Sequence, residues 1–136
     1  MIKNPPFDWY KFYKLGYILS KHESDEYLRT AINRFYYSAF CYARDYLISK
    51  QIFHNKELKN EMLSNTGNVH KATREIFKKE KRQINPKKGR KVHKYLHSLR
   101  KNRNKVDYDS NADFDLEHLA KQSEAYSKKI FEIIEK

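Results

Sequence analysis

The sequence has little of the residues that cross-link, bend or interrupt a chain. It holds one cysteine, three glycines and three prolines in 136 residues. A single cysteine, Cys41, cannot form an internal disulfide, which favours a reducing compartment. So few glycines and prolines argue against a multi-turn β architecture and against a long flexible linker. Length and composition therefore predict one domain, residues 1–136, around one core.

Long apolar runs are also missing. The longest uncharged apolar stretch, residues 35–43, is far too short to span a membrane. The first seven residues lack the apolar segment of a signal peptide. We therefore expect a cytoplasmic protein with no membrane partner.

Basic residues dominate the charge. Lysine and arginine outnumber aspartate and glutamate by 29 to 17, for a net charge of +12. The excess lies in residues 50–105, which carry 18 basic and 4 acidic side chains. Such a field attracts polyanions, whose counterions are released on binding. Nucleic acid or nucleotide binding is one interpretation, and a solvated basic face is the other.

Apolar residues recur at helical spacing in five segments. We expect helices over residues 8–21, from residue 24 or 25 through 47, and over 69–80, 90–107 and 115–134. Residues 51–67 lose the pattern, residues 81–89 form a basic loop, and residues 109–113 form a break. The second segment has the most regular stripe: Leu28, Ile32, Phe35, Tyr36, Ala39, Ala43, Tyr46 and Leu47. The predicted fold class is all-α, an up-down bundle of four to five helices.

An arginine occupies an apolar position in the segment 90–107. The inward line runs through residues 92, 96, 99, 103 and 106, so Arg103 stands where the pattern asks for leucine. Burying an unpaired guanidinium is expensive. Arg103 must be paired, lie in a groove or face a second subunit. An ion pair with Asp45 or Asp107 is the structural explanation, and a functional site is the alternative.

Two further features could bind nucleic acid. Arg34 and Tyr37 flank the apolar stripe, where a tyrosine ring either packs in the core or stacks on a base. The sequence Lys88-Gly89-Arg90, at the start of a predicted helix, could hold a phosphate on the helix N-terminus.

Metal motifs are weak. His93 and His97 have the one-turn spacing of helical metal sites, but their neighbours Lys91, Lys94 and Arg100 would repel a cation. We therefore expect no metal and no cofactor. The remaining histidines are predicted to be isolated surface or capping residues: His22, His54, His70 and His118.

Residues 31–40 read AINRFYYSAF, and residues 99–108 read LRKNRNKVDY. The first segment resembles the R-x-YY-x-A-F signature of small prokaryotic proteins of the HEPN family (higher eukaryotes and prokaryotes nucleotide-binding). The second resembles the RN-x-x-D-Y ending of their late helix. The order and spacing of the two segments fit, and the resemblance covers about residues 9–134.

The resemblance implies a helical bundle that forms a homodimer, with the late helices facing each other. Many members look like metal-independent endoribonucleases with an R-x(4–6)-H motif, acting as toxins beside a nucleotidyltransferase antitoxin or in phage defence. Carried onto this chain, Arg103 clamps the phosphate, and Asn104 and Asp107 orient it. Tyr108 stands at the histidine position, where it would act at the ribose. A tyrosine, with a pKa of about 10, is a weak general base.

The resemblance thus implies an RNA-binding protein with endoribonuclease-like residues. The alternatives are a non-catalytic nucleotide- or RNA-binding subunit that partners a nucleotidyltransferase or a defence enzyme, and a helical dimerisation scaffold. The candidate nucleic-acid-binding residues are Arg34, Tyr37, Lys87, Lys88, Arg90, Lys91 and Arg100.

Overall fold

The computed structural model describes residues 7–64, 66–109 and 115–135. These residues form six helices and no strand, which confirms the all-α prediction. The number of helices is larger than the four to five that the sequence predicted. None of the described helices is both long and apolar enough to span a membrane. The helices are α1 (Tyr10–Ser20), α2 (Asp25–Lys50), α3 (Lys56–Met62), α4 (Asn68–Lys79), α5 (Pro86–Tyr108) and α6 (Leu116–Glu135).

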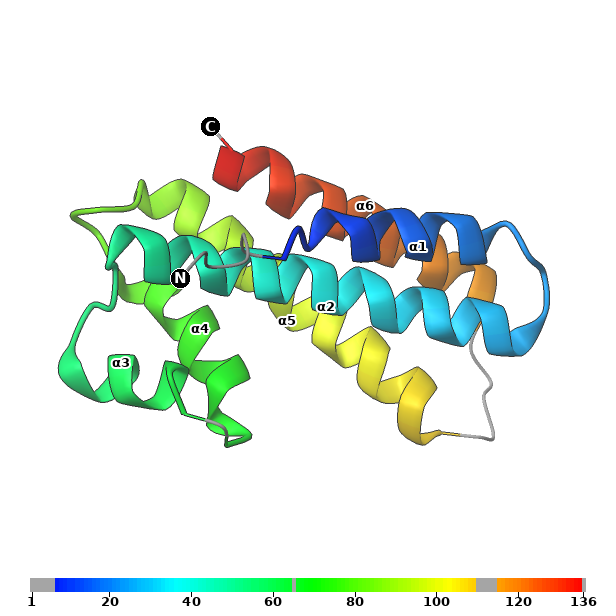
Figure 1. Ribbon diagram of the computed structural model, residues 1–136, viewed down its shortest axis with the longest axis horizontal. Coiled ribbons are helices and arrows are strands. Elements are labelled where there is room, and N and C mark those ends of the chain that lie inside the picture. The colour runs from blue at the N-terminus through cyan, green and yellow to red at the C-terminus, as the bar shows by residue number, and fades with distance from the viewer. Residues whose placement is uncertain (1–6, 65, 110–114, 136) are drawn as a thin grey trace, which may run out of the picture.

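The central helix of the bundle is α2, which packs against α1, α5 and α6. Helices α1, α2, α5 and α6 alternate in direction, as an up-down bundle requires (Figure 1). The short helix α3 and helix α4 form an excursion at one end of α2, and α4 packs on α5. Helix α5 therefore packs against three helices, α2, α4 and α6.

The apolar stripe predicted for the second helix is buried, and it explains why α2 is central. Seven of its eight residues are buried, and Tyr46 is half-buried. Phe35 and Tyr36 are among the largest fully buried side chains. Gly16 of α1 sits directly against the Phe35 ring, 2.9 Å from where a Cβ would lie, so the missing side chain lets α1 approach α2 closely.

Helix α3 contradicts the expectation that residues 51–67 have no regular structure. Asn55 caps this helix, its Oδ1 accepting the backbone N–H of Leu58 at 2.8 Å. Leu58 and Met62, one turn apart, are both buried. A helix of 7 residues presents only these two apolar positions, too few to show a period.

The basic loop is shorter than predicted, because α5 begins at Pro86 rather than near residue 90. The side chain of Asn85 accepts the N–H groups of Lys87 and Lys88 at 2.9 and 3.3 Å. Gly89 is buried against the backbone carbonyl of Phe77, at the end of α4. The helix N-terminus on which Lys88-Gly89-Arg90 was expected to hold a phosphate is thus capped by the Asn85 side chain, and the phosphate site stays a prediction. Residues 110–113 of the expected break lie outside the described residues.

Candidate functional site

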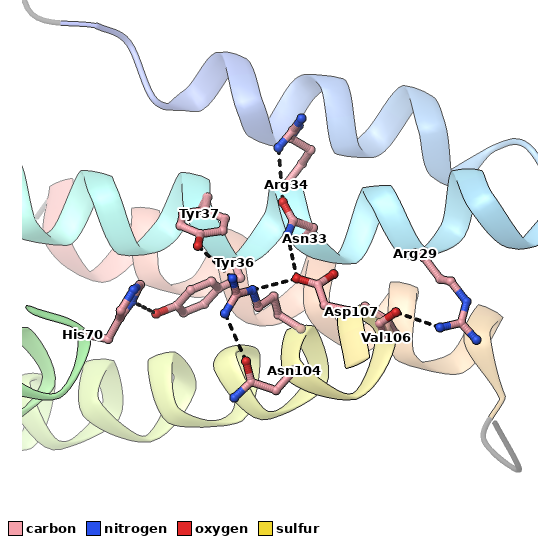
Figure 2. Close-up of polar contacts among 10 residues, drawn as sticks. Arg29, Asn33, Arg34, Tyr36, Tyr37, His70, Asn104, Val106 and Asp107 are labelled. Carbon is pink, nitrogen blue, oxygen red and sulfur yellow. Dashed lines mark hydrogen bonds and ion pairs between the residues drawn. The ribbon is translucent and has the colours of Figure 1, made fainter. Parts of the chain in front are cut away.

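The two segments that carry the sequence motifs lie side by side. Helix α2 presents Asn33 and Tyr37 toward the C-terminal half of α5, which carries Asn104 and Asp107 (Figure 2). Arg103 of α5 connects these side chains into one polar network. Ser38, next to Tyr37, points the other way and hydrogen-bonds Ser127 of α6 in the core at 3.1 Å.

Arg103 is the centre of this network. Its Nη2 donates to Tyr37 Oη at 2.9 Å, and its Nη1 donates to Asn104 Oδ1 at 3.0 Å. Its Nε lies 2.9 Å from Asp107 Oδ2, as an ion pair without the alignment of a hydrogen bond. The guanidinium carbon lies 5.2 Å from the centroid of the Tyr37 ring. Only 15 % of the Arg103 side chain is exposed.

Asp107 extends the network back to α2. Its Oδ2 also accepts from Asn33 Nδ2 at 3.1 Å, and Asn33 Oδ1 accepts from Arg34 Nη1 at 3.1 Å. Arg34 then lies over the ring of Phe12 in α1, at 5.2 Å, and its buried Nε has no hydrogen-bond partner. Arg34 is therefore three contacts away from Arg103 and faces α1, which the sequence did not indicate.

Tyr108, the last residue of the segment 99–108, lies on the surface. Its side chain is 78 % exposed, and its ring centroid lies 5.9 Å from the Arg103 guanidinium carbon. The residue at the position of the motif histidine is thus close to the candidate phosphate-binding arginine and accessible to a large ligand.

The candidate ion pair with Asp45 does not form. Asp45 instead accepts a hydrogen bond from Trp9 Nε1 at 2.8 Å, which ties α2 to the residue that precedes α1. The other candidate partner, Asp107, is the one that Arg103 contacts.

A histidine that the sequence placed on the surface as an isolated residue joins the site from α4. His70 is half-buried, and its Nδ1 lies 2.5 Å from Tyr36 Oη. Figure 2 shows the two side chains pointing toward each other. The His70 ring also lies 4.4 Å from that of Phe40 and 6.2 Å from that of Tyr37, centroid to centroid. One signal was available in the sequence: a tyrosine in a buried stripe needs a partner for its hydroxyl.

The surroundings of His70 favour its neutral form. Burial, and to a smaller extent the positive charges of Arg100, Arg103 and Arg74, lower the pKa of His70 from 6.5 to about 4. Burial also raises the pKa of Tyr36, so that the tyrosine keeps its proton. At neutral pH this pair is therefore an uncharged hydrogen bond surrounded by arginines.

The remaining predicted nucleic-acid contacts fall into two places. Arg100 is half-buried on α5, one turn before Arg103. The other four lie on the first turns of α5, about 20 Å along the helix from Arg103 at 1.5 Å per residue. All four are exposed: Lys87, Lys88, Arg90 and Lys91. The basic stretch is thus a separate surface, which only an extended polyanion could contact together with Arg103.

Histidines 93 and 97 do not form part of a metal cluster. Their rings lie 6.5 Å apart, centroid to centroid, and His93 Nε2 is 3.8 Å from Glu75 Oε1. Nowhere in the described parts of the chain do three or more histidine, cysteine or acidic side chains gather in a way that could hold a metal ion.

Comparison of the chain with family models, curated proteins and solved structures finds no match in any of the three. The likeness to the HEPN family therefore depends on residues 31–40 and 99–108 alone. The structure places these two segments in contact, which is what a shared site requires. Membership of the family stays a prediction.

Proposed function

We propose that the chain is an RNA-binding protein of the HEPN type, in which Arg103 contacts a phosphate of the RNA backbone. One observation above all supports this. The Arg103 guanidinium is fixed in orientation by Tyr37 from one helix and by Asn104 and Asp107 from another. A cation held in this way loses little side-chain freedom on binding, and a planar guanidinium matches the oxygens of a phosphate.

The guanidinium also keeps donors available. Arginine has five N–H groups. One N–H of each terminal nitrogen is engaged, by Tyr37 and by Asn104, which leaves the second N–H of each nitrogen for a phosphate oxygen. The exposed ring of Tyr108 beside them adds a surface on which a base can stack. The Arg103 guanidinium and the Tyr108 ring lie close enough together to contact the phosphate and the base of one nucleotide.

The competing explanation is that Arg103 serves only to join α2 to α5. The ion pair with Asp107 and the hydrogen bond to Tyr37 are compatible with that role. The two explanations differ in what a substitution changes. A structural arginine affects the free energy of unfolding alone, whereas a phosphate-binding arginine affects RNA affinity in a protein that still folds.

Assembly and partners follow from the same resemblance. We propose a homodimer in which α5 and part of α2 face their copies across a two-fold axis, bringing two Arg103 sites near each other. A nucleotidyltransferase antitoxin is the partner that the resemblance implies. A non-catalytic subunit that presents RNA or a nucleotide to such an enzyme would use the same surface.

Metal-independent RNA cleavage is the second candidate function, and the exposure of Tyr108 beside Arg103 favours it. In this reaction the ribose 2′-hydroxyl gives up its proton and attacks the adjacent phosphorus, while the 5′-oxygen leaves and takes up a proton, giving a 2′,3′-cyclic phosphate and a free 5′-hydroxyl. Arg103 would stabilise the negative charge that builds on the phosphate oxygens. Asn104 and Asp107 would hold the guanidinium in place, and Tyr108 would hydrogen-bond the ribose.

Total RNA and tRNA incubated with the purified protein test both functions. Cleavage should persist in EDTA, and Arg103→Ala should slow it by about 10² to 10³, the usual loss for one electrostatic group. Tyr108→Phe removes one hydroxyl, and Tyr108→His restores a group that titrates near neutral pH. If only Tyr108→His cleaves, the native domain binds RNA without cutting it. If the wild type neither binds nor cleaves RNA, the proposal is wrong.

A further inference from the structure

Two arginines lie near His70 on the face where α4 meets α5. Arg74 is one turn after His70 on α4, and Arg100 is one turn before Arg103 on α5. The charges of both act on His70 and on Tyr36, and the charge of Arg100 acts on Arg74. The two guanidinium groups therefore lie within electrostatic reach of each other and of the His70–Tyr36 pair.

These arginines differ from Arg103 in having no acidic partner. Arg103 is paired with Asp107, but no ion pair or hydrogen bond within the described residues involves Arg74 or Arg100. Glu75 is the one carboxylate that acts on Arg74, and it is already shared by Lys79 at 3.6 Å and His93 at 3.8 Å. The positive charge at this face is therefore compensated only in part, by the shared carboxylate of Glu75.

Arg74 also has an unsatisfied donor. Its Nη1 is buried and has no hydrogen-bond partner. Leaving a buried donor without a partner costs free energy, more so when the group is charged. Burial, and to a smaller extent Arg100, lower the pKa of Arg74. An anion bound here would satisfy the donor and offset the repulsion between the two arginines.

We propose that Arg74 and Arg100, together with His70, form a second anion site that binds a phosphate group. Arginine suits such a ligand because its planar fork can donate two hydrogen bonds to one phosphate. The site is distinct from the Arg103 network, although Tyr37 contacts both Arg103 and the His70 ring. It would bind phosphate whether or not Arg103 contacts RNA. Only the source of the phosphate, an internal phosphodiester or a terminal phosphate, rests on the proposed function.

The charged groups around His70 make the protonation of its ring sensitive to a bound phosphate. His70 faces Tyr36 and Tyr37 from α2, Arg74 on its own helix, and Arg100 and Arg103 from α5, and no carboxylate is among the groups that act on it. A phosphate bound to these arginines would cancel part of the positive charge that disfavours protonation. The His70 ring should therefore take up a proton more readily when phosphate is present.

The test is a titration of the full chain with inorganic phosphate, followed by calorimetry and by the ring resonances of His70. Arg74→Gln and Arg100→Gln should each weaken binding about tenfold, as expected for the loss of a charge-assisted hydrogen bond. The control is Lys101→Gln, which removes the same charge from an exposed position on α5. It should change the affinity by less than about twofold, because an exposed charge contributes little. Circular dichroism shows whether each variant keeps the helical fold.

Saturable binding that both arginine variants weaken and the control does not would support the site. Equal loss in all three variants, or no saturable binding, would overturn it. A second arm compares an oligoribonucleotide with a 5′-phosphate and the same one with a 5′-hydroxyl. Preference for the 5′-phosphate, lost in Arg74→Gln, assigns the site to a terminal phosphate, and equal binding assigns it to an internal one. If phosphate binds and neither oligonucleotide does, the anion site stands and the RNA-binding proposal fails.

Discussion

His70 should make the folded protein lose stability as the pH falls from about 6.5 toward 4. In the unfolded chain the ring titrates near its ordinary pKa of 6.5, whereas in the fold its pKa is about 4. Between these values the unfolded state binds a proton that the folded state does not, so acid favours unfolding. Above pH 6.5 the ring is neutral in both states, and this contribution to stability is fully present.

The size of the effect follows from the pKa difference. One pKa unit corresponds to about 1.4 kcal/mol, so the full shift would be worth roughly 3 kcal/mol. Because the ring is only half-buried, solvent screening reduces the expected loss to roughly 1–2 kcal/mol. That loss is still measurable against the total stability of a domain of this size, which is on the order of 5–15 kcal/mol.

Urea unfolding between pH 7.5 and 4.5 measures this loss, with His70→Asn as the variant. Asparagine can still accept from or donate to Tyr36 Oη, but it does not titrate. The variant should therefore lose less stability on acidification than the wild type, by about 1–2 kcal/mol. His93, whose pKa burial also lowers, is present in both proteins and cancels in the comparison. Identical pH dependence would mean that the arginines and burial do not keep the His70 ring neutral.

Two further predictions concern the surface and the assembly. RNA affinity should fall with salt at a log–log slope of about −4 to −6 for six to eight phosphate contacts, and charge reversal of Lys87, Lys88, Arg90 and Lys91 should flatten it. An unchanged slope would make this stretch a solvated face. Light scattering at tens of micromolar should report twice the 16.5 kDa mass of one chain, and a monomer would exclude the dimer.

The sequence predicted those elements whose apolar positions repeat many times. The stripe of α2 spans about five turns, and its period determined both the helix and its buried face. Helix α3 was missed because Leu58 and Met62 alone cannot define a period. The predicted start of α5 was wrong for another reason. Asn85 and Pro86 are a strong helix-start signal, but the surrounding lysines were interpreted as a loop.

The candidate site was predicted in part for similar reasons. Arg103 and Asp107 share one helix face, so their ion pair follows from a spacing of four. The contacts of Arg103 with Tyr37, and of His70 with Tyr36, join residues 66 and 34 positions apart in the sequence. No local pattern predicts which of two distant helices packs against a third. The sequence therefore indicated the two motif segments but not the third contributor from α4.

The most direct test of the account compares the RNA affinity of Arg103→Ala with that of Arg29→Ala. Both variants lose one arginine where α2 meets α5, but Arg29 donates to the backbone carbonyls of Val106 and Asp109 at the end of α5. Fluorescence anisotropy with a single-stranded RNA should show at least about a tenfold loss for Arg103→Ala and less than about a twofold loss for Arg29→Ala, with both proteins folded. Equal affinities, accompanied by a lower melting temperature for Arg103→Ala, would contradict the account and make Arg103 a purely structural ion-pair residue.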